Sequence, residues 1–251
     1  MLSHGILRKY PQIRSTMLLG GALILLVSVL YSSVSGDTAP AARESDYDIY
    51  SRGFRVGELK TICEVLSCNE KRVLKFASST RVKINLLLYS FTLDNREEAL
   101  ISDEGTISYR RTTREKDSVC DVEGRMAHGR FLLDISENGI KHSMAVDREK
   151  YDYTSMECPE TAMKHEGDEM TLRLLDLDTL MLVNRRYRWI KNEEVTIDGR
   201  KINCRVIDFS DVNKQCRRWI RPDAAGAIIV RQEGTGKNGR YSLRMAHLRD
   251  S

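Results

Sequence analysis

Turn residues recur along this chain every 8–12 positions, and the segments between them alternate apolar with polar side chains. The stretch FLLDISENGIKHSMAV reads as two short strands about Asn138-Gly139, and EEVTIDGRKINCRVIDF repeats the pattern about Asp198-Gly199. Such dipeptides between alternating segments are strong short-range signals for a β-hairpin. Turns at this spacing are typical of an antiparallel meander, sandwich or barrel, so we predict a mainly β fold.

One segment departs from the strand pattern. In GDEMTLRLLDLDTLM, the residues Leu174, Leu177 and Met181 have helical spacing, and Asp168 is placed to cap a helix start. We therefore expect one short helix over residues 168–178.

Residues 1–36 resemble a targeting segment. Three basic residues, Arg8, Lys9 and Arg14, precede the mostly apolar run 17–34, and small residues follow, which is the pattern of a secretory signal peptide. An 18-residue apolar run is also just long enough to span a bilayer core of roughly 30 Å, so a retained N-terminal membrane anchor is the alternative. Both interpretations predict a periplasmic or exported location, or an inner-membrane anchor with the domain on the periplasmic side.

The rest of the chain reads as a linker over 37–45 and a single β-rich exported domain over 46–248. With the three basic residues of the leader set aside, 37 Lys and Arg residues face 36 Asp and Glu residues. This nearly neutral balance gives no electrostatic reason to expect nucleic acid as a partner.

Six cysteines in an exported chain favour disulfides over free buried thiols. A hairpin centred on Ser210 would place Cys204 opposite Cys216, and a turn at Val65-Leu66 would bring Cys63 to Cys68, although Asn69-Glu70 offers a rival turn. The remaining pair would be Cys120 and Cys158.

No motif indicates catalysis, a metal or a cofactor. The histidines are scattered, C-x-x-C and G-x-S-x-G are absent, and the acidic pairs read as solvated carboxylates. Gly234, Gly236 and Gly239 spell the dinucleotide fingerprint G-x-G-x-x-G, but the following RYSLRMAHL alternates as a strand. A dinucleotide site needs a helix there, so we expect a hairpin loop instead.

Three stretches resemble a group of uncharacterised secreted bacterial proteins of unknown function. YDIYSRGFRVGELKT, with Gly53 and Val56-Gly57, resembles their opening strands. RVKINLLLYSFTLDNREEALISDEGTISYRRTTRE resembles their central part, and CRRWIRPDAAGAIIVRQEGTGKNGRYSLRM resembles their end. The resemblance covers about two-thirds of the exported chain, and the group is similar in turn to the LolA/LolB-like periplasmic lipoprotein-carrier superfamily.

That resemblance implies an antiparallel, half-open (unclosed) β-barrel with one or two short helices on its concave side. It implies a non-enzymatic periplasmic protein that binds a lipid or a lipoprotein acyl chain there. The alternative is an envelope structural or protein-interaction module without a small ligand. The six cysteines depart from the family pattern. On the first interpretation, the side chains expected to line the hollow are Leu86, Leu88, Tyr187, Trp189 and Trp219.

Overall fold

The computed structural model describes residues 42–68, 71–86, 89–223, 226–236 and 239–250. The leader-like segment 1–36 lies outside these residues, as does the first part of the expected linker. The first strand already begins at Ala42, within the range expected to be linker. Among the residues described, no helix has the length and apolar character needed to cross a membrane.

Strands make up most of the described chain, which confirms the mainly β prediction. In chain order they are β1 (Ala42–Ser51), β2 (Phe54–Cys68), β3 (Lys71–Leu86), β4 (Tyr89–Ser102), β5 (Gly105–Glu115), β6 (Ser118–Ala127), β7 (Arg130–Glu137), β8 (Ile140–Asp147), β9 (Tyr153–Thr154), β10 (Glu169–Asp176), β11 (Met181–Ile197), β12 (Arg200–Ser210), β13 (Gln215–Asp223), β14 (Gly226–Gly236) and β15 (Gly239–Asp250). Two single-turn 3₁₀ helices, η2 (Arg148–Lys150) and η3 (Pro159–Ala162), lie between β8 and β10.

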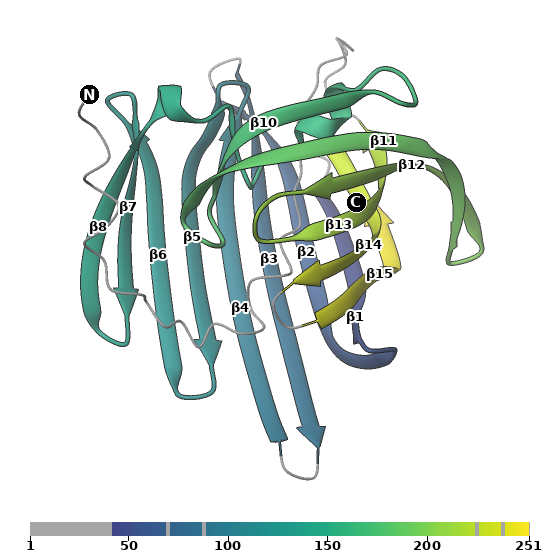
Figure 1. Cartoon of the computed structure of the whole chain (residues 1–251), viewed down its shortest axis with the longest axis horizontal. Helices are drawn as coiled ribbons and strands as arrows, with labels where there is room; N and C mark the ends of the chain where they lie inside the picture. Colours follow the sequence, from purple (N-terminus) through teal and green to yellow (C-terminus); the bar gives the residue numbers. More distant parts are fainter. Residues whose placement is uncertain (1–41, 69–70, 87–88, 224–225, 237–238, 251) are drawn as a thin grey trace.

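All fifteen strands form one open sheet, and the first and last strands, β1 and β15, pair with each other at its middle. Its order is β8-β7-β6-β5-β4-β3-β2-β1-β15-β14-β13-β12-β11-β10-β9, and every pair is antiparallel except β9 with β10. The sheet bends at β1 and β15, so that β10–β13 cross in front of the long strands β3–β5 (Figure 1). This arrangement is a coiled, barrel-like sheet with a concave interior between its two halves.

The hairpin predictions are confirmed at both dipeptides. Asn138 and Gly139 have φ values of 50° and 84°, and Asp198 and Gly199 have φ values of 49° and 75°. Two successive residues with positive φ form the type I′ turn that matches the twist of antiparallel strands. The G-x-G-x-x-G stretch also forms a hairpin, with Gly236 facing Gly239 across the β14–β15 turn.

The helix expected over 168–178 is wrong, because this segment forms strand β10. Leu172, Leu174 and Asp176 point to the interior and face residues of β11 across an antiparallel ladder. The Asp168 carboxylate accepts hydrogen bonds from the preceding amides of Lys164 and His165, at 2.8 and 2.9 Å, so it closes the turn before it. Cross-strand pairing has overridden a short helical spacing.

The predicted disulfides are not formed among the cysteines whose side chains the structure describes. The β12–β13 hairpin turns around Val212 and Asn213, and Cys216 therefore faces Phe209 while Cys204 lies farther along β12. The turn thus lies beyond the expected centre at Ser210, and the resulting register separates the sulfur atoms of Cys204 and Cys216.

The described residues do not support the other two predicted pairs either. The backbone of β2 runs without a turn from Phe54 to Cys68, so the turn expected at Val65-Leu66 is absent and Cys63 faces Phe76. Cys120 lies in β6, Cys158 lies just before η3, and no disulfide joins them.

Candidate functional site

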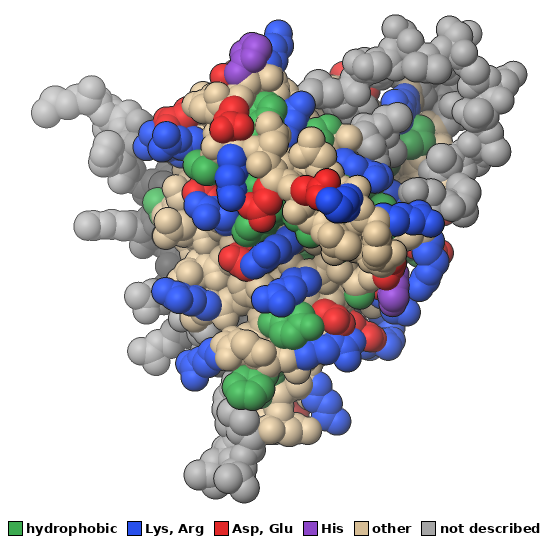
Figure 2. All heavy atoms as spheres, turned by 90° about the vertical axis from the view of Figure 1, so that its right-hand side faces the viewer, with side chains coloured by type: hydrophobic (Ala, Val, Ile, Leu, Met, Phe, Trp, Pro, Cys, Tyr) green, Lys and Arg blue, Asp and Glu red, His purple; other side chains and the backbone are tan. Residues whose placement is uncertain are grey.

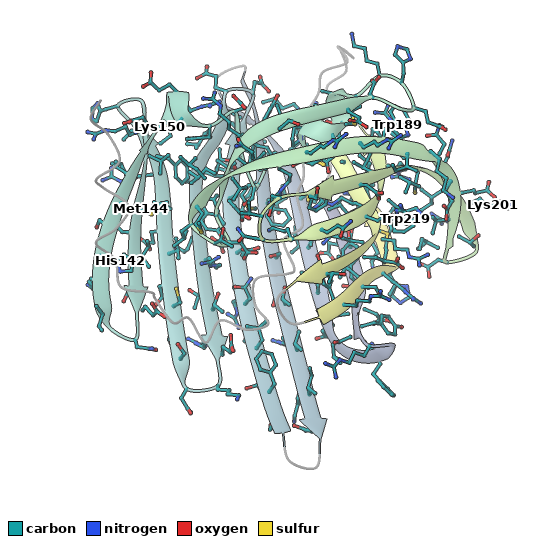
Figure 3. The ribbon with its side chains drawn as sticks, viewed as in Figure 1. His142, Met144, Lys150, Trp189, Lys201 and Trp219 are labelled. Carbon is teal, nitrogen blue, oxygen red and sulfur yellow. The ribbon has the colours of Figure 1, made fainter. Side chains whose placement is uncertain are left out.

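The residues expected to line a hollow do not share one surface of the fold. Tyr187 and Trp189 are buried on the concave side of β11. Arg186 and Arg188, which alternate with them along the strand, are exposed. Trp219 lies on the opposite face of β13 from the inward Arg218, and Arg231 stacks on it at 4.6 Å (Figure 3). Leu86 ends β3, and Leu88 lies outside the described residues.

The described interior is occupied by a segment that connects the two edges of the sheet. We call residues 151–163 the plug; seven consecutive residues of it, Thr154–Glu160, are buried. Arg218 donates a hydrogen bond to Glu160 at 2.7 Å, and Arg205 donates to the carbonyl oxygen of Met163 at 2.9 Å. The plug, which includes the single-turn 3₁₀ helix η3, fills the concave side.

A set of buried charges lies beside the plug. This ionic cluster comprises Glu97, Arg111, Asp176, Asp178, Arg185, Asp211 and Lys214. Arg185 contacts Asp176 at 3.2 Å and Asp211 at 2.8 Å. Arg111 of β5 donates to the carbonyl oxygen of Leu177 at 3.0 Å and contacts Asp178 at 3.4 Å, which ties β5 to the β10–β11 turn.

The cluster contains four carboxyl groups and three cations, so it carries one unbalanced negative charge when all are ionised. Burial raises the pKa of Asp178 to about 7, although Lys214 and Arg111 favour its ionised form. Burial also raises the pKa of Glu97. Although burial opposes its ionisation as well, Lys214 and Arg185 hold the pKa of Asp176 below its ordinary value. The cluster is therefore suited to hold one proton near neutral pH.

An open cleft of about 920 Å³ lies at the rim of the sheet. It is formed by the β4–β5 turn, the β6–β7 turn, the segment after β8 and part of β10. The turns that form it contain Gly105 and Gly129, with φ values of 117° and 72°. Its acidic and basic side chains are Asp103, Glu104, His128, Arg130, Asp147, Arg148, Glu149, Asp152, Glu157 and Arg173.

Glu157 of the plug anchors one wall of this cleft. Its Oε1 accepts hydrogen bonds from the amide and the hydroxyl of Thr106, at 3.2 and 2.9 Å. The same oxygen accepts from the amide and the hydroxyl of Thr154, at 3.1 and 3.0 Å. These bonds fix β5 to β9 and hold the rim in one arrangement.

Two of the three arginines in the cleft are engaged by the protein itself. Arg148 donates to the carbonyl oxygens of Tyr151 and Asp152, at 2.6 and 3.2 Å. Arg173 contacts the Asp152 carboxylate at 2.7 Å and, through this hydrogen bond, lowers its pKa. Burial raises the pKa of Tyr151 to about 12, and its hydroxyl has no hydrogen-bond partner among the described residues.

Six carboxylates against three guanidinium groups give the cleft an excess of negative charge. No serine, threonine or cysteine is among its described lining residues, and its hydroxyl groups are those of Tyr151 and Tyr153. Its open shape and charge suit the binding of a cationic chain segment.

Sequence reasoning missed this cleft because its residues come from four separate segments. The dipeptides Glu104-Gly105 and His128-Gly129 each mark a turn, so they indicate two of these four segments in the sequence. Alternate hairpin turns of a meander lie at the same end of the sheet, so these two turns share a rim.

Comparisons with known proteins bear on the fold. Neither the protein-family models nor the curated proteins contain a match to this chain. Among solved structures, the chain is similar to a β-barrel-like protein of domain of unknown function DUF1849 from Brucella abortus. The two share 12% identity with a TM-score of 0.55, over 84% of this chain and 98% of that chain. This likeness supports a barrel-like fold.

Proposed function

We propose that the chain is a non-enzymatic binding module of the cell envelope that holds a cationic segment of a partner protein in the rim cleft. The observation that carries this proposal is the excess of carboxylates in the cleft, with Arg148 and Arg173 already held by carbonyl oxygens and Asp152. The envelope location rests on the leader-like residues 1–36.

The filled interior favours this module over a carrier of acyl chains. Tyr187 and Trp189 pack against the protein's own side chains, with the Tyr187 ring 5.7 Å from that of Phe209 and Arg205 4.3 Å from the Trp189 ring. A lipid would have to displace the plug and leave Glu160 and Arg218 without each other, which is costly for buried charges. Lipid binding stays a prediction, and native mass spectrometry of the purified protein would detect it.

Peptide binding tests the proposal directly. We expect a fluorescent peptide of alternating lysine and serine to bind the full chain, and its glutamate–serine counterpart to bind much more weakly, in anisotropy titrations. The variant Glu104→Gln/Glu149→Gln should weaken binding of the lysine peptide by about three- to tenfold, because each exposed ion pair contributes only modestly.

The matched control is Glu123→Gln/Glu194→Gln, which removes two exposed carboxylates from β6 and β11, outside the cleft. This control should bind the lysine peptide as the unmodified chain does. Equal losses in both variants, or equal binding of the two peptides, would contradict a site in the cleft.

A further inference from the structure

Strand β8 ends the sheet with a regular edge. It is eight residues long, pairs with β7 without a register shift, and has no described neighbour on its other side. His142 and Met144 lie along this edge (Figure 3), and all its side chains but Val146 are exposed or half-buried. Every second residue of an edge strand directs its N–H and C=O away from the sheet. This edge can therefore accept another strand.

The opposite edge of the sheet is protected. There β9 has only two residues, and the neighbouring chain covers β10: the Asp152 amide donates to the Arg173 carbonyl oxygen, and the Arg173 amide donates to the Asp152 carboxylate, both at 2.8 Å. Proteins shield edges by such coverage, by bulges, by proline or by several charges. β8 contains no proline and a single lysine, so it lacks most of these devices.

The sequence of β8 is complementary to itself in one register. Along an antiparallel pair, hydrogen-bonded and non-hydrogen-bonded facing pairs alternate. A two-fold axis between two identical strands must therefore pass between two copies of the same residue, which face each other, and not between peptide bonds. When the pair is centred on Met144, Lys141 of each strand faces Asp147 of the other. Centring on Ser143 or Ala145 leaves both charges without a partner of opposite sign within the strand.

We propose that two copies of this chain pair antiparallel through β8, centred on Met144, with Lys141 of each copy facing Asp147 of the other. Both side chains lie on the same face of β8, because they are an even number of residues apart, and facing opposite charges stabilise such pairs. The remaining facing pairs, Ser143 with Ala145 and His142 with Val146, fit without like charges. Two-fold pairing covers the β8 edge of each copy, so assembly stops at the dimer.

Charge reversal tests this register in the full chain. Sedimentation velocity from about 10 to 200 μM should show a reversible dimer of the unmodified chain. Lys141→Asp and Asp147→Lys should each weaken the dimer by at least about tenfold, because each places two like charges opposite each other. The double variant Lys141→Asp/Asp147→Lys should restore the dimer to within about threefold, since the opposite charges face again.

The control Lys201→Asp changes an exposed lysine at the distant β11–β12 hairpin (Figure 3) and should leave the dimer unchanged. In a second measurement, Met144→Cys should give a disulfide-linked dimer on mild oxidation, because facing Cα atoms lie within disulfide range, whereas Lys201→Cys should not. A monomer throughout the concentration range, or a double variant that fails to recover, would overturn the proposal. Asp147 lines the cleft, whereas Lys141 and Met144 do not, so the lysine-peptide titration of Lys141→Asp and Met144→Cys reports on the cleft separately.

Discussion

Two parts of the interior are equally buried but are filled by different chemistry. Beneath the β6–β7 hairpin, Val122, Phe131 and Leu133 are fully buried, and the Phe131 ring lies over Gly124. In the ionic cluster, Arg185 and Asp176 are buried just as completely. The first region requires only complementary shape, whereas the second also requires each charge to keep its partner.

The two regions also differ in how far apart along the chain their members lie. Gly124 and Phe131 come from one hairpin, whereas Arg111 of β5 meets Asp178 across 67 residues. An apolar contact that is lost costs in proportion to the volume removed, while a buried charge that loses its partner costs its desolvation as well. We therefore expect substitutions in the ionic cluster to lower the stability more than substitutions in the apolar region, and the following changes test that difference.

Removing the central cation should have the largest effect. Arg185→Ala leaves Asp176 and Asp211 without their shared partner, and we expect the free energy of unfolding to fall by about 3–5 kcal/mol. Urea titration followed by tryptophan fluorescence measures this fall. The control is Arg186→Ala, the next residue on β11, whose side chain is exposed and contacts Glu169. Equal effects of the two variants would contradict the special role of the buried cation.

Overfilling the apolar region should cost less. A Cβ atom on Gly124 would lie 2.6 Å from the Phe131 ring, so Gly124→Ala should lower the free energy of unfolding by about 1–3 kcal/mol. The smaller side chain in Phe131→Leu should relieve this clash. The double variant should therefore be more stable than the sum of the two single changes predicts, and a double-mutant cycle measures this coupling. Strict additivity would show that the ring is not the obstacle.

The protonation of the ionic cluster gives the smallest expected effect. Because the pKa of Asp178 is raised in the folded state, the folded chain favours the protonated carboxyl. Its stabilisation is complete below the ordinary pKa of 3.8 and is lost as the pH rises through about 7. Between pH 6 and 8 the free energy of unfolding should fall by about 1–2 kcal/mol from this group.

Asp178→Asn should flatten that dependence, because the amide stays neutral at every pH. Denaturant titrations at pH 6, 7 and 8 for both proteins measure the difference. A variant whose stability changes with pH as steeply as that of the unmodified chain would show that another group holds the proton. Glu97, whose pKa is also raised by burial, would then be the next group to replace.

The apolar region could be predicted from the sequence, because alternation and X-Gly turns are local signals. FLLDISENGI indicates the β7–β8 hairpin. The burial of Tyr187 and Trp189 follows from the same alternation, because the exposed Arg186 and Arg188 alternate with them. The comparison with a solved β-barrel-like structure agrees with the mainly β prediction.

The ionic cluster and the plug could not be predicted in this way. Arginine and aspartate on a strand normally mark its solvent face, and only the crossing of the two sheet halves buries Arg111 and Asp178 together. Thr154–Glu160 contains polar and acidic residues and no periodic pattern, yet it is buried. The misplaced helix and disulfides have the same origin, since both depended on strand registers that local spacing does not set.

Both charged and apolar side chains cover the outside in small separated groups on the face that carries the β11–β12 hairpin and β15 (Figure 2). A surface without a large apolar patch on that side gives no second candidate for an extensive interface there.

The pairing of β1 with β15 has a consequence for how the chain reaches this fold. Glu44 and Arg249 are neighbours although they lie 205 residues apart in the sequence, while nearly all other strand pairs are hairpins. Hairpins form locally and quickly, so closure of this central seam should limit the folding rate. Since Arg43 faces Asp250, a short linker can join the two strands, and a chain reopened at Asp198-Gly199 would keep every strand neighbour. In that circular permutant the seam becomes a local hairpin, and refolding should be faster.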